Sequence, residues 1–228
     1  MNKEWKGNSK SVHALLGVNK RCDKNGREAD DFYATDPVAL ELLLEAGNKD
    51  YEYAYDGKYV APIRLRNEKF YIWEPAAGVG NLSNFLLERG YQVFATDIKD
   101  RGANGVIGGI DFLKADPNGL TQIYPVFTPR IIITNPPYSL ATEFILHALE
   151  VLRDGGLYIA LMNISYLAGI DRYKRVYSKG CLREVYIFSK RIECWRNNNP
   201  NLQSGHMANY AWYIFQKGYF GQPTLYWL

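Results

Sequence analysis

Short apolar runs alternate with amphipathic segments from residue 70 to the end of the sequence. The runs are rich in β-branched and aromatic residues, which predicts strands at 70–74, 92–96, 130–134, 157–162, 183–188 and 210–218. Apolar residues at helical spacing separate them, which predicts helices at 81–90, 141–152 and 172–178. Strands that alternate with helices form βαβ units. We therefore expect an α/β fold with a mostly parallel sheet and helices on both faces.

Another helix is predicted before this alternating pattern. Asp36 can cap it, Pro37 suits its first turn and Gly47 can end it. Residues 1–30 are polar and rich in Lys, Asn and Asp, which indicates an N-terminal arm. A DG turn between aromatic-rich runs suggests a hairpin within 48–68. We therefore predict an arm at 1–30 and one domain at 31–228, with an insertion at 48–68.

Composition narrows the class of protein. The chain has 228 residues and is 47% hydrophobic, enough for one sizeable core. It has no apolar run long enough to span a membrane, and MNKEWKGNSK lacks the apolar segment of a secretory signal. The cysteines, Cys22, Cys181 and Cys194, are widely spaced without a CxxC pair, so we expect neither a disulfide framework nor a metal site. These features favour a reducing cytoplasm and no membrane partner.

Charge is distributed unevenly along the chain. From Arg153 onward there are ten basic and four acidic side chains, a net charge of +6, and the whole chain carries +3, so residues 1–152 carry −3. A basic C-terminal third suggests a polyanionic partner. The alternative is a solvated charged face, which charge alone favours.

Two motifs follow the first two predicted strands of the alternating pattern, and ligands bind at such strand ends in parallel sheets. In EPAAGVG (74–80), Gly78 and Gly80 let the backbone approach a ligand closely. Glu74 would repel a pyrophosphate but attract an ammonium group. Asp97, at the end of the next strand, can accept hydrogen bonds from both hydroxyls of a ribose. An ordinary tight turn and a helix cap are the respective alternatives.

A third motif, IDFLKAD, offers a carboxylate beside an aromatic ring. Asp111 could accept a hydrogen bond from the exocyclic amine of an adenine, with Phe112 against the ring. A surface Asp beside a core Phe is the alternative.

The fourth motif, NPPY, ends the apolar run at 130–134. The side-chain oxygen of Asn135 can accept a hydrogen bond from one N–H group. The Pro136 carbonyl can accept a hydrogen bond from a second N–H group, in a direction fixed by the proline ring. Tyr138 can stack on a flat ring. Two acceptors aimed at a planar NH₂ group favour the pyramidal, nucleophilic form that develops in a transition state. A proline-rich turn is the alternative for NPP alone.

Together, these motifs resemble those of the S-adenosylmethionine-dependent amino-methyltransferases. The order EPAAGVG, Asp97, Asp111-Phe112 and Asn135-Pro136-Pro137-Tyr138 is most similar to small phage- and prophage-encoded DNA adenine-N6 methyltransferases. FYATDP, DRG and YAWYIFQKG also resemble that group, so the resemblance covers about Asp31 to the C-terminus. It implies a Rossmann-like class I methyltransferase domain, with a seven-stranded sheet whose last strand is reversed.

The resemblance also implies roles for individual residues. The predicted cofactor is S-adenosylmethionine, and its predicted binding residues are Tyr33, Thr35, Pro37, Glu74, Pro75, Ala76, Gly78, Gly80, Asp97, Ile98, Asp111, Phe112 and Asn135. The catalytic residues it implies are Asn135, Pro136, Pro137 and Tyr138, with Tyr138 stacking on the target base. The reaction is a direct displacement that requires no metal.

The expected partner is nucleic acid, most of all double-stranded DNA with the target base flipped out. A long target-recognition domain is missing, so we expect recognition from the arm, the 48–68 insertion and the basic loop at 190–209. In that loop, Lys190, Arg191, Trp195 and Arg196 suit a phosphate backbone and a flipped base, although Trp195 could instead pack beneath the loop. RNA adenine-N6 or protein glutamine-N5 methylation, and an inactive nucleic-acid-binding module, stay open as alternatives.

Overall fold

The computed structural model describes residues 33–49, 71–116, 129–192, 194–196 and 209–228. All of them lie within one compact unit, Phe32–Leu228. The predicted arm, nearly all of the 48–68 insertion and most of the basic loop lie outside the described residues. No helix in the described part of the chain is long and apolar enough to cross a membrane.

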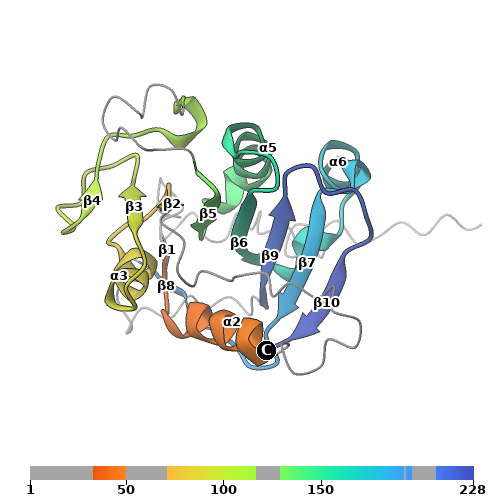
Figure 1. The fold of residues 1–228 in the computed structure, drawn as a ribbon, viewed down its shortest axis with the longest axis horizontal. Coiled ribbons are helices and arrows are strands. Elements are labelled where there is room, and N and C mark those ends of the chain that lie inside the picture. The colour runs from red at the N-terminus through yellow and green to blue at the C-terminus, as the bar shows by residue number, and fades with distance from the viewer. Residues whose placement is uncertain (1–32, 50–70, 117–128, 193, 197–208) are drawn as a thin grey trace, which may run out of the picture. The chain divides into compact units, whose positions relative to one another are not determined.

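The main sheet has eight strands within the described residues (Figure 1). Its order across the sheet is β10-β7-β9-β6-β5-β2-β3-β4. In chain order, the strands are β2 (Ile72–Glu74), β3 (Val93–Thr96), β4 (Val106–Ile107), β5 (Ile131–Thr134), β6 (Leu157–Asn163), β7 (Leu182–Ile187), β9 (Tyr210–Gln216) and β10 (Thr224–Trp227). β9 runs antiparallel to both of its neighbours, β6 and β7, and every other pairing in this sheet is parallel. The predicted α/β fold with a reversed strand near the C-terminus is confirmed.

The sheet has one strand more than the expected seven. After reversed β9, the chain adds β10 to the outer edge, with Thr224 opposite Glu184 and Trp227 opposite Ile187. The sequence hides this strand because it is short and follows Pro223 closely. Its apolar positions also stay partly exposed, including Leu225 and Trp227.

Helices cover both faces of this sheet (Figure 1). The α-helices of the described residues are α2 (Val38–Lys49), α3 (Asn81–Glu88), α5 (Ala141–Val151) and α6 (Ile170–Arg175). Short 3₁₀ turns are η2 (Phe112–Lys114), η3 (Tyr138–Leu140), η4 (Ile164–Leu167) and η5 (Tyr177–Lys179). α2 and α3 pack in one hydrophobic cluster, and α5 packs in another. The central strands are therefore buried on both faces, which is why their sequences read as continuous apolar runs.

Successive side chains of β5 divide between the two clusters. Ile131 and Ile133 pack with α2 and α3, whereas Ile132 packs with α5. All four residues of β5 are buried, and Thr134 is the last of them. The strand therefore delivers the following residue, Asn135, to the edge of a core that is closed on both sides.

The first helix begins as its sequence predicts. The Asp36 side chain accepts a hydrogen bond from the backbone nitrogen of Val38 at 3.0 Å, as an N-terminal cap does. The predicted end at Gly47 is wrong by two residues, because α2 continues to Lys49. A glycine inside a helix costs only about 1 kcal/mol relative to alanine, so flanking contacts can carry the helix past it.

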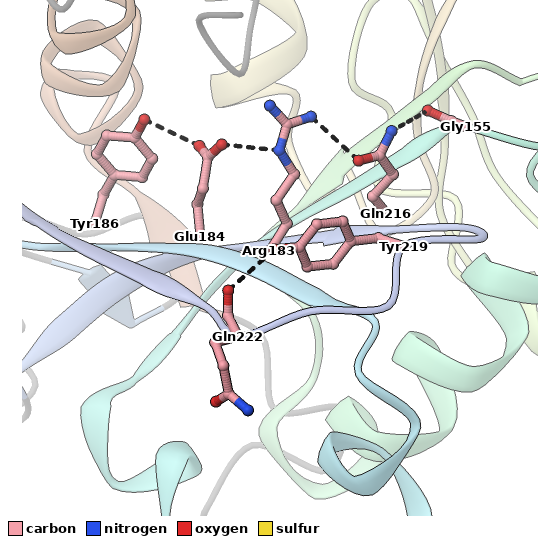
Figure 2. Close-up of polar contacts among 7 residues, drawn as sticks. All are labelled: Gly155, Arg183, Glu184, Tyr186, Gln216, Tyr219 and Gln222. Carbon is pink, nitrogen blue, oxygen red and sulfur yellow. Dashed lines mark hydrogen bonds and ion pairs between the residues drawn. The ribbon is translucent and has the colours of Figure 1, made fainter. Parts of the chain in front are cut away.

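An ion pair on β7 holds a buried carboxylate, and its arginine connects to β9 (Figure 2). Glu184 lies at an irregularity in the β7–β9 pairing and is 4% exposed. Its carboxylate pairs with Arg183 Nε at 2.9 Å and accepts a hydrogen bond from the Tyr186 hydroxyl at 3.1 Å. Arg183 also donates to Gln216 of β9, whose amide donates to the Gly155 carbonyl. These donors stabilise a carboxylate that burial would otherwise disfavour.

A separate two-stranded sheet joins two distant segments. β1 (Tyr33–Thr35) pairs antiparallel with β8 (Cys194–Arg196), with Thr35 opposite Cys194. The predicted basic loop at 190–209 therefore contains a strand at its start. This pairing holds the beginning of that loop against the FYATDP segment.

Candidate active site

Three loops meet at the C-terminal edge of the parallel strands. β2 pairs with β3 on one side and with β5 on the other, all in the same direction. The loops after these strands therefore leave from the same edge of the sheet. They carry EPAAGVG, Asp97 and NPPY, so the fold brings together three motifs that are separate in the sequence. Ligands bind at this edge in sheets of this type.

The glycine loop is fastened to the end of β3. The Ala77 nitrogen donates to the Thr96 carbonyl at 2.9 Å, and the Gly78 nitrogen donates to Asp97 Oδ2 at 2.8 Å. Gly78 and Gly80 have φ values of 59° and 86°, which lie in the left-handed region that glycine adopts readily. The loop is therefore tight, and it presents backbone rather than side chains to the strand edge.

Asp97 holds a buried carboxylate beside an exposed apolar side chain. Besides its bond to Gly78, it accepts a hydrogen bond from the Lys99 nitrogen at 2.9 Å and lies 3.7 Å from Arg101 Nε. A carboxylate has about four acceptor sites, so further hydroxyl donors can be accommodated. The next residue, Ile98, is 57% exposed although it is apolar. A hydroxyl acceptor next to an apolar surface suits a nucleoside.

Glu74 is a buried carboxyl group at the end of β2. It is 2% exposed, and burial raises its pKa to about 8, even though hydrogen bonds from the Ser83 side chain and backbone act to lower it. Oε2 of Glu74 has no hydrogen-bond partner among the described residues. A buried acceptor of this kind favours a cationic ligand, which would satisfy Oε2 and stabilise its charged form.

Asp111 and Phe112 occupy different environments. Asp111 caps η2 by accepting from the Leu113 nitrogen at 3.1 Å, and it pairs with Lys114 Nζ at 3.1 Å. Phe112 is 2% exposed, and its ring packs against Trp73 and Phe144 at centroid distances of 5.0 and 4.8 Å. Phe112 is therefore a core residue, as in the alternative that the sequence left open. Contact of either residue with a cofactor stays a prediction.

The side chain of Asn135 is oriented by a residue one hundred positions earlier. Its Nδ2 donates to Thr35 Oγ1 at 3.0 Å, and Thr35 is 3% exposed. The Thr35 carbonyl also accepts from Asn81 Nδ2 at 3.2 Å, at the first residue of α3. Thr35 therefore connects the NPPY loop to the helix that follows the glycine loop. Asn81 was not among the predicted site residues.

Hydrogen bonds hold Tyr138 at its side-chain hydroxyl and at its backbone carbonyl. Its hydroxyl donates to the Tyr210 hydroxyl at 2.8 Å, and its carbonyl accepts from the Tyr166 hydroxyl at 2.6 Å. Burial raises the pKa of Tyr138 well above its ordinary value, with further contributions from Cys194 and Tyr210. Burial also raises the pKa of the Cys194 thiol to about 12. Both groups are therefore protonated at neutral pH, so neither is a ready general base.

The supporting residues Tyr166, Cys194 and Tyr210 are not among the predicted site residues. Tyr166 follows a predicted strand end, a position that can line a target pocket, although the sequence favoured a core role for it. Tyr210 begins YAWYIFQKG, which carries part of the family resemblance but gave Tyr210 no role, and no local motif marks Cys194. Their contribution depends on pairing between distant strands, which a single sequence does not reveal.

The residues predicted to bind nucleic acid are only partly described. Lys190 and Arg191 follow β7 and are exposed. The backbone of Trp195 and Arg196 forms part of β8, but their side chains lie outside the described residues. Among described residues, no group of three or more His, Cys, Asp or Glu side chains could hold a metal ion.

The sequence matches no protein-family model and no curated protein. Solved structures share its fold. A candidate class I S-adenosylmethionine-dependent methyltransferase from Listeria monocytogenes has 13% identity and a TM-score of 0.57, covering 96% of this chain and 71% of its own. A type I restriction-modification methyltransferase subunit from Streptococcus thermophilus has 16% identity and a TM-score of 0.51, covering 85% of this chain and 46% of its own. DrdV, in a complex with DNA, has 13% identity and a TM-score of 0.57, covering 94% of this chain and 30% of its own.

The fold is that of the class I methyltransferases, as the sequence predicts. At such low identity, the likeness establishes the fold, and a fold by itself can host several activities. The substrate must therefore be argued from the residues at the strand edge.

Proposed function

We propose that this protein transfers a methyl group from S-adenosylmethionine to the exocyclic N6 amine of adenine in DNA. The observation that carries the proposal is the Asn135 amide, whose nitrogen is bonded to Thr35 Oγ1 at 3.0 Å. This hydrogen bond uses one N–H of the amide and supports an acceptor role for the amide oxygen. The acceptor follows β5, whose neighbour β2 leads into the glycine loop. An amine-binding loop thus leaves the sheet beside a loop suited to a nucleoside cofactor.

The described residues fit S-adenosylmethionine. Gly78 and Gly80 would lie under its methionine part, Asp97 would bind the ribose hydroxyls, and Ile98 would pack on the adenine. The buried Oε2 of Glu74, with no hydrogen-bond partner among the described residues, suits the cofactor's amino group. When bound, the cofactor supplies a methyl group on a positively charged sulfur, which makes that carbon electrophilic.

The NPPY loop would activate the target amine without deprotonating it first. Asn135 Oδ1 and the Pro136 carbonyl would each accept a hydrogen bond from one N–H group of the target amine. That arrangement favours the pyramidal nitrogen, in which the lone pair is free to attack. As the N–C bond forms, the methyl–sulfur bond would break with its electron pair staying on sulfur, and the methylated nitrogen would then release one proton to water. Asn135 Oδ1 is shielded from solvent, and hydrogen bonds are electrostatically stronger where water is excluded. Tyr138, protonated and held at both ends, would stack on the target ring rather than accept a proton.

Nucleic acid is the substrate class that the charge of the chain favours. The segment from Arg153 onward carries a net charge of +6. Two structural neighbours, the restriction-modification methyltransferase subunit and the DrdV–DNA complex, support this choice. An adenine inside a duplex cannot reach a strand-edge pocket, so the target base would be flipped out of the helix.

Transfer of a tritiated methyl group to unmethylated DNA tests the proposal. We expect the wild type to label DNA and Asn135→Ala to lose at least about a hundredfold in rate, the usual effect of removing a preorganised hydrogen-bonding group. Asn104→Ala is the matched control, because Asn104 is an exposed asparagine in the turn before β4. Calorimetry with S-adenosylmethionine on the same variant separates a loss of methyl transfer from a loss of cofactor binding, because Asn135 is also a predicted cofactor-binding residue.

Three results would contradict the proposal. Equal labelling by wild type and Asn135→Ala would remove the role of the amide. Labelling of RNA or of a protein glutamine in place of DNA would keep the chemistry but change the substrate. No cofactor binding at millimolar S-adenosylmethionine would instead favour an inactive nucleic-acid-binding module.

A further inference from the structure

Large apolar side chains are exposed on α6, the short helix after β6. Ile170 and Tyr173 are 75% and 61% exposed. In a helix, residues at spacings of three and four share one face, which here also includes Lys174. We call Ile170, Tyr173 and Lys174 the α6 face. Contiguous exposed apolar residues beside charged ones are typical of an interaction site.

The segment that carries the α6 face is attached to the NPPY loop. The Tyr166 hydroxyl donates to the Tyr138 carbonyl at 2.6 Å. The Arg172 guanidinium lies 4.6 Å from the centre of the Tyr166 ring and donates to the Ala168 carbonyl at 2.8 Å. Tyr166 thus contacts the NPPY loop on one side and α6 on the other. Whatever docks on the α6 face will therefore lie close to the proposed target pocket.

A second attachment comes from the other end of α6. Arg175 pairs with Glu143, in the first turn of α5, at 3.0 Å, and α5 follows NPPY directly. Val176, just past α6, is 1% exposed and belongs to the core. The inner side of the segment is therefore fixed, while Ile170 and Tyr173 stay outside the core.

Gly169 makes the turn that brings Arg172 back over Tyr166. Its φ of 123° lies in the region that favours glycine. A Cβ at this position would lie 3.0 Å from Arg172 Nη2. The positive φ therefore favours glycine here, and any side chain would require the Arg172 guanidinium to shift.

The charge around the α6 face selects the class of partner. Residues 170–179 contain Arg172, Lys174, Arg175 and Lys179 against one acid, Asp171, a net charge of +3. Arg175 is engaged by Glu143 and Asp171, whereas Lys174 and Lys179 are exposed. A second copy of the chain docking by this same face would bring like charges together. A polyanion with apolar surface between its charges fits better.

Resting on the proposed function, we infer that the α6 face docks the DNA duplex beside the extruded adenine. Flipping a base out leaves a gap in the stack and exposes the faces of neighbouring bases. Ile170 and Tyr173 supply apolar and aromatic surface for those bases, as inserted or stacked side chains do in other DNA-binding proteins. Lys174, on the same face, contacts a phosphate. The α6 face thus adds a DNA-contacting element outside the predicted basic loop.

Fluorescence anisotropy with a labelled, unmethylated duplex tests this inference in the full-length protein. We expect Ile170→Ala and Tyr173→Ala each to weaken binding by about tenfold, within the range measured for stacked side chains. Lys174→Gln should reduce the slope of log affinity against log salt by about 1. The control Leu87→Ala removes a side chain that is 46% exposed on α3, on the other face of the sheet, and should bind like the wild type.

Cofactor binding, measured by calorimetry on the same variants, separates the two proposals. The inference predicts unchanged S-adenosylmethionine affinity in all of them. Wild-type duplex affinity in both Ile170→Ala and Tyr173→Ala would overturn the inference and leave the proposed function standing. Wild type that neither binds the cofactor nor labels DNA would overturn the proposed function instead. A change in oligomeric state on sedimentation, or preference for an RNA hairpin over the duplex, would also overturn the inference.

Discussion

The Thr35 hydroxyl group helps to set the orientation of the Asn135 amide. Thr35 Oγ1 accepts the Asn135 Nδ2 proton, and the two residues are one hundred positions apart in the sequence. An amide reversed by 180° would present its NH₂ group to the target amine, and two donors cannot bond to each other. The proposed acceptor role of Asn135 therefore depends in part on a residue that is distant in the sequence.

We predict that Thr35→Val lowers the rate of methyl transfer by about tenfold, the scale of one hydrogen bond to a buried amide. The effect should fall on kcat, because the amide acts on the reacting nitrogen. Thr35→Ser keeps the hydroxyl and should restore most of the rate. Steady-state kinetics on DNA with both variants checks this, and similar rates for Val and Ser would contradict it.

The buried carboxyl group of Glu74 makes the free energy of unfolding depend on pH. Its pKa in the folded protein is about 8, against an ordinary value of 4.5. Between these values, the folded state holds a proton that the unfolded state releases, so the free energy of unfolding falls as pH rises. The stabilising effect of the proton is complete below pH 4.5 and is lost by about pH 8.

Replacing Glu74 by glutamine should remove this dependence. We predict that Glu74→Gln becomes more stable relative to wild type from pH 5 to pH 8, by on the order of 3 kcal/mol, since each pKa unit is worth about 1.4 kcal/mol. Urea unfolding at several pH values measures the difference. Glu88→Gln, at an exposed position of α3, is the control and should show no such trend. Parallel pH profiles for wild type and Glu74→Gln would contradict the prediction.

Elements with a strong local signal could be predicted from the sequence. Asp36 and Pro37 predict the start of α2, and the apolar run before Asn135 predicts β5. Strands without such a signal could not. β10 is short and partly exposed, and β1 exists through its pairing with the distant β8. Propensity describes neighbours along the chain, whereas these strands are stabilised by neighbours in space.

The same distinction holds for the candidate site. The glycine loop, Asp97 and NPPY each follow a predictable strand, so the sequence could place them at one edge of the sheet. The contacts that support them could not be predicted in this way. Tyr210 and Cys194 meet Tyr138 only because β8 and β9 lie beside the NPPY loop. The α6 face also escaped prediction, because apolar residues at helical spacing are normally read as a buried side.

The ion pair at the β7–β9 irregularity is an element-scale prediction. Arg183→Met would remove the positive charge that lies 2.9 Å from the buried Glu184 carboxylate and should destabilise the fold by about 3 kcal/mol. Tyr186→Phe removes one hydrogen bond to the same carboxylate and should cost about 1 kcal/mol. Lys179→Met, at an exposed position, is the control. Urea unfolding that ranks the three variants in any other order would contradict this account of the network.

At the scale of the whole molecule, a few residues connect the elements proposed to bind the cofactor, the target base and the DNA partner. Thr35 reaches both the NPPY loop and α3, and Tyr166 connects the NPPY loop to the α6 face. Four of the ten basic side chains of the C-terminal third lie within residues 170–179, in and just after α6. The sequence could indicate the charge but not where the fold would gather it.

Mass spectrometry of nucleosides tests the central claim most directly. Unmethylated DNA would be incubated with the wild-type protein and S-adenosylmethionine carrying a deuterated methyl group, and then digested to single nucleosides. The account predicts labelled N6-methyldeoxyadenosine in the wild-type reaction and its loss with Asn135→Ala. Label in a cytosine product, or no labelled nucleoside although the protein binds the cofactor, would contradict the claim that this site methylates the adenine amine of DNA.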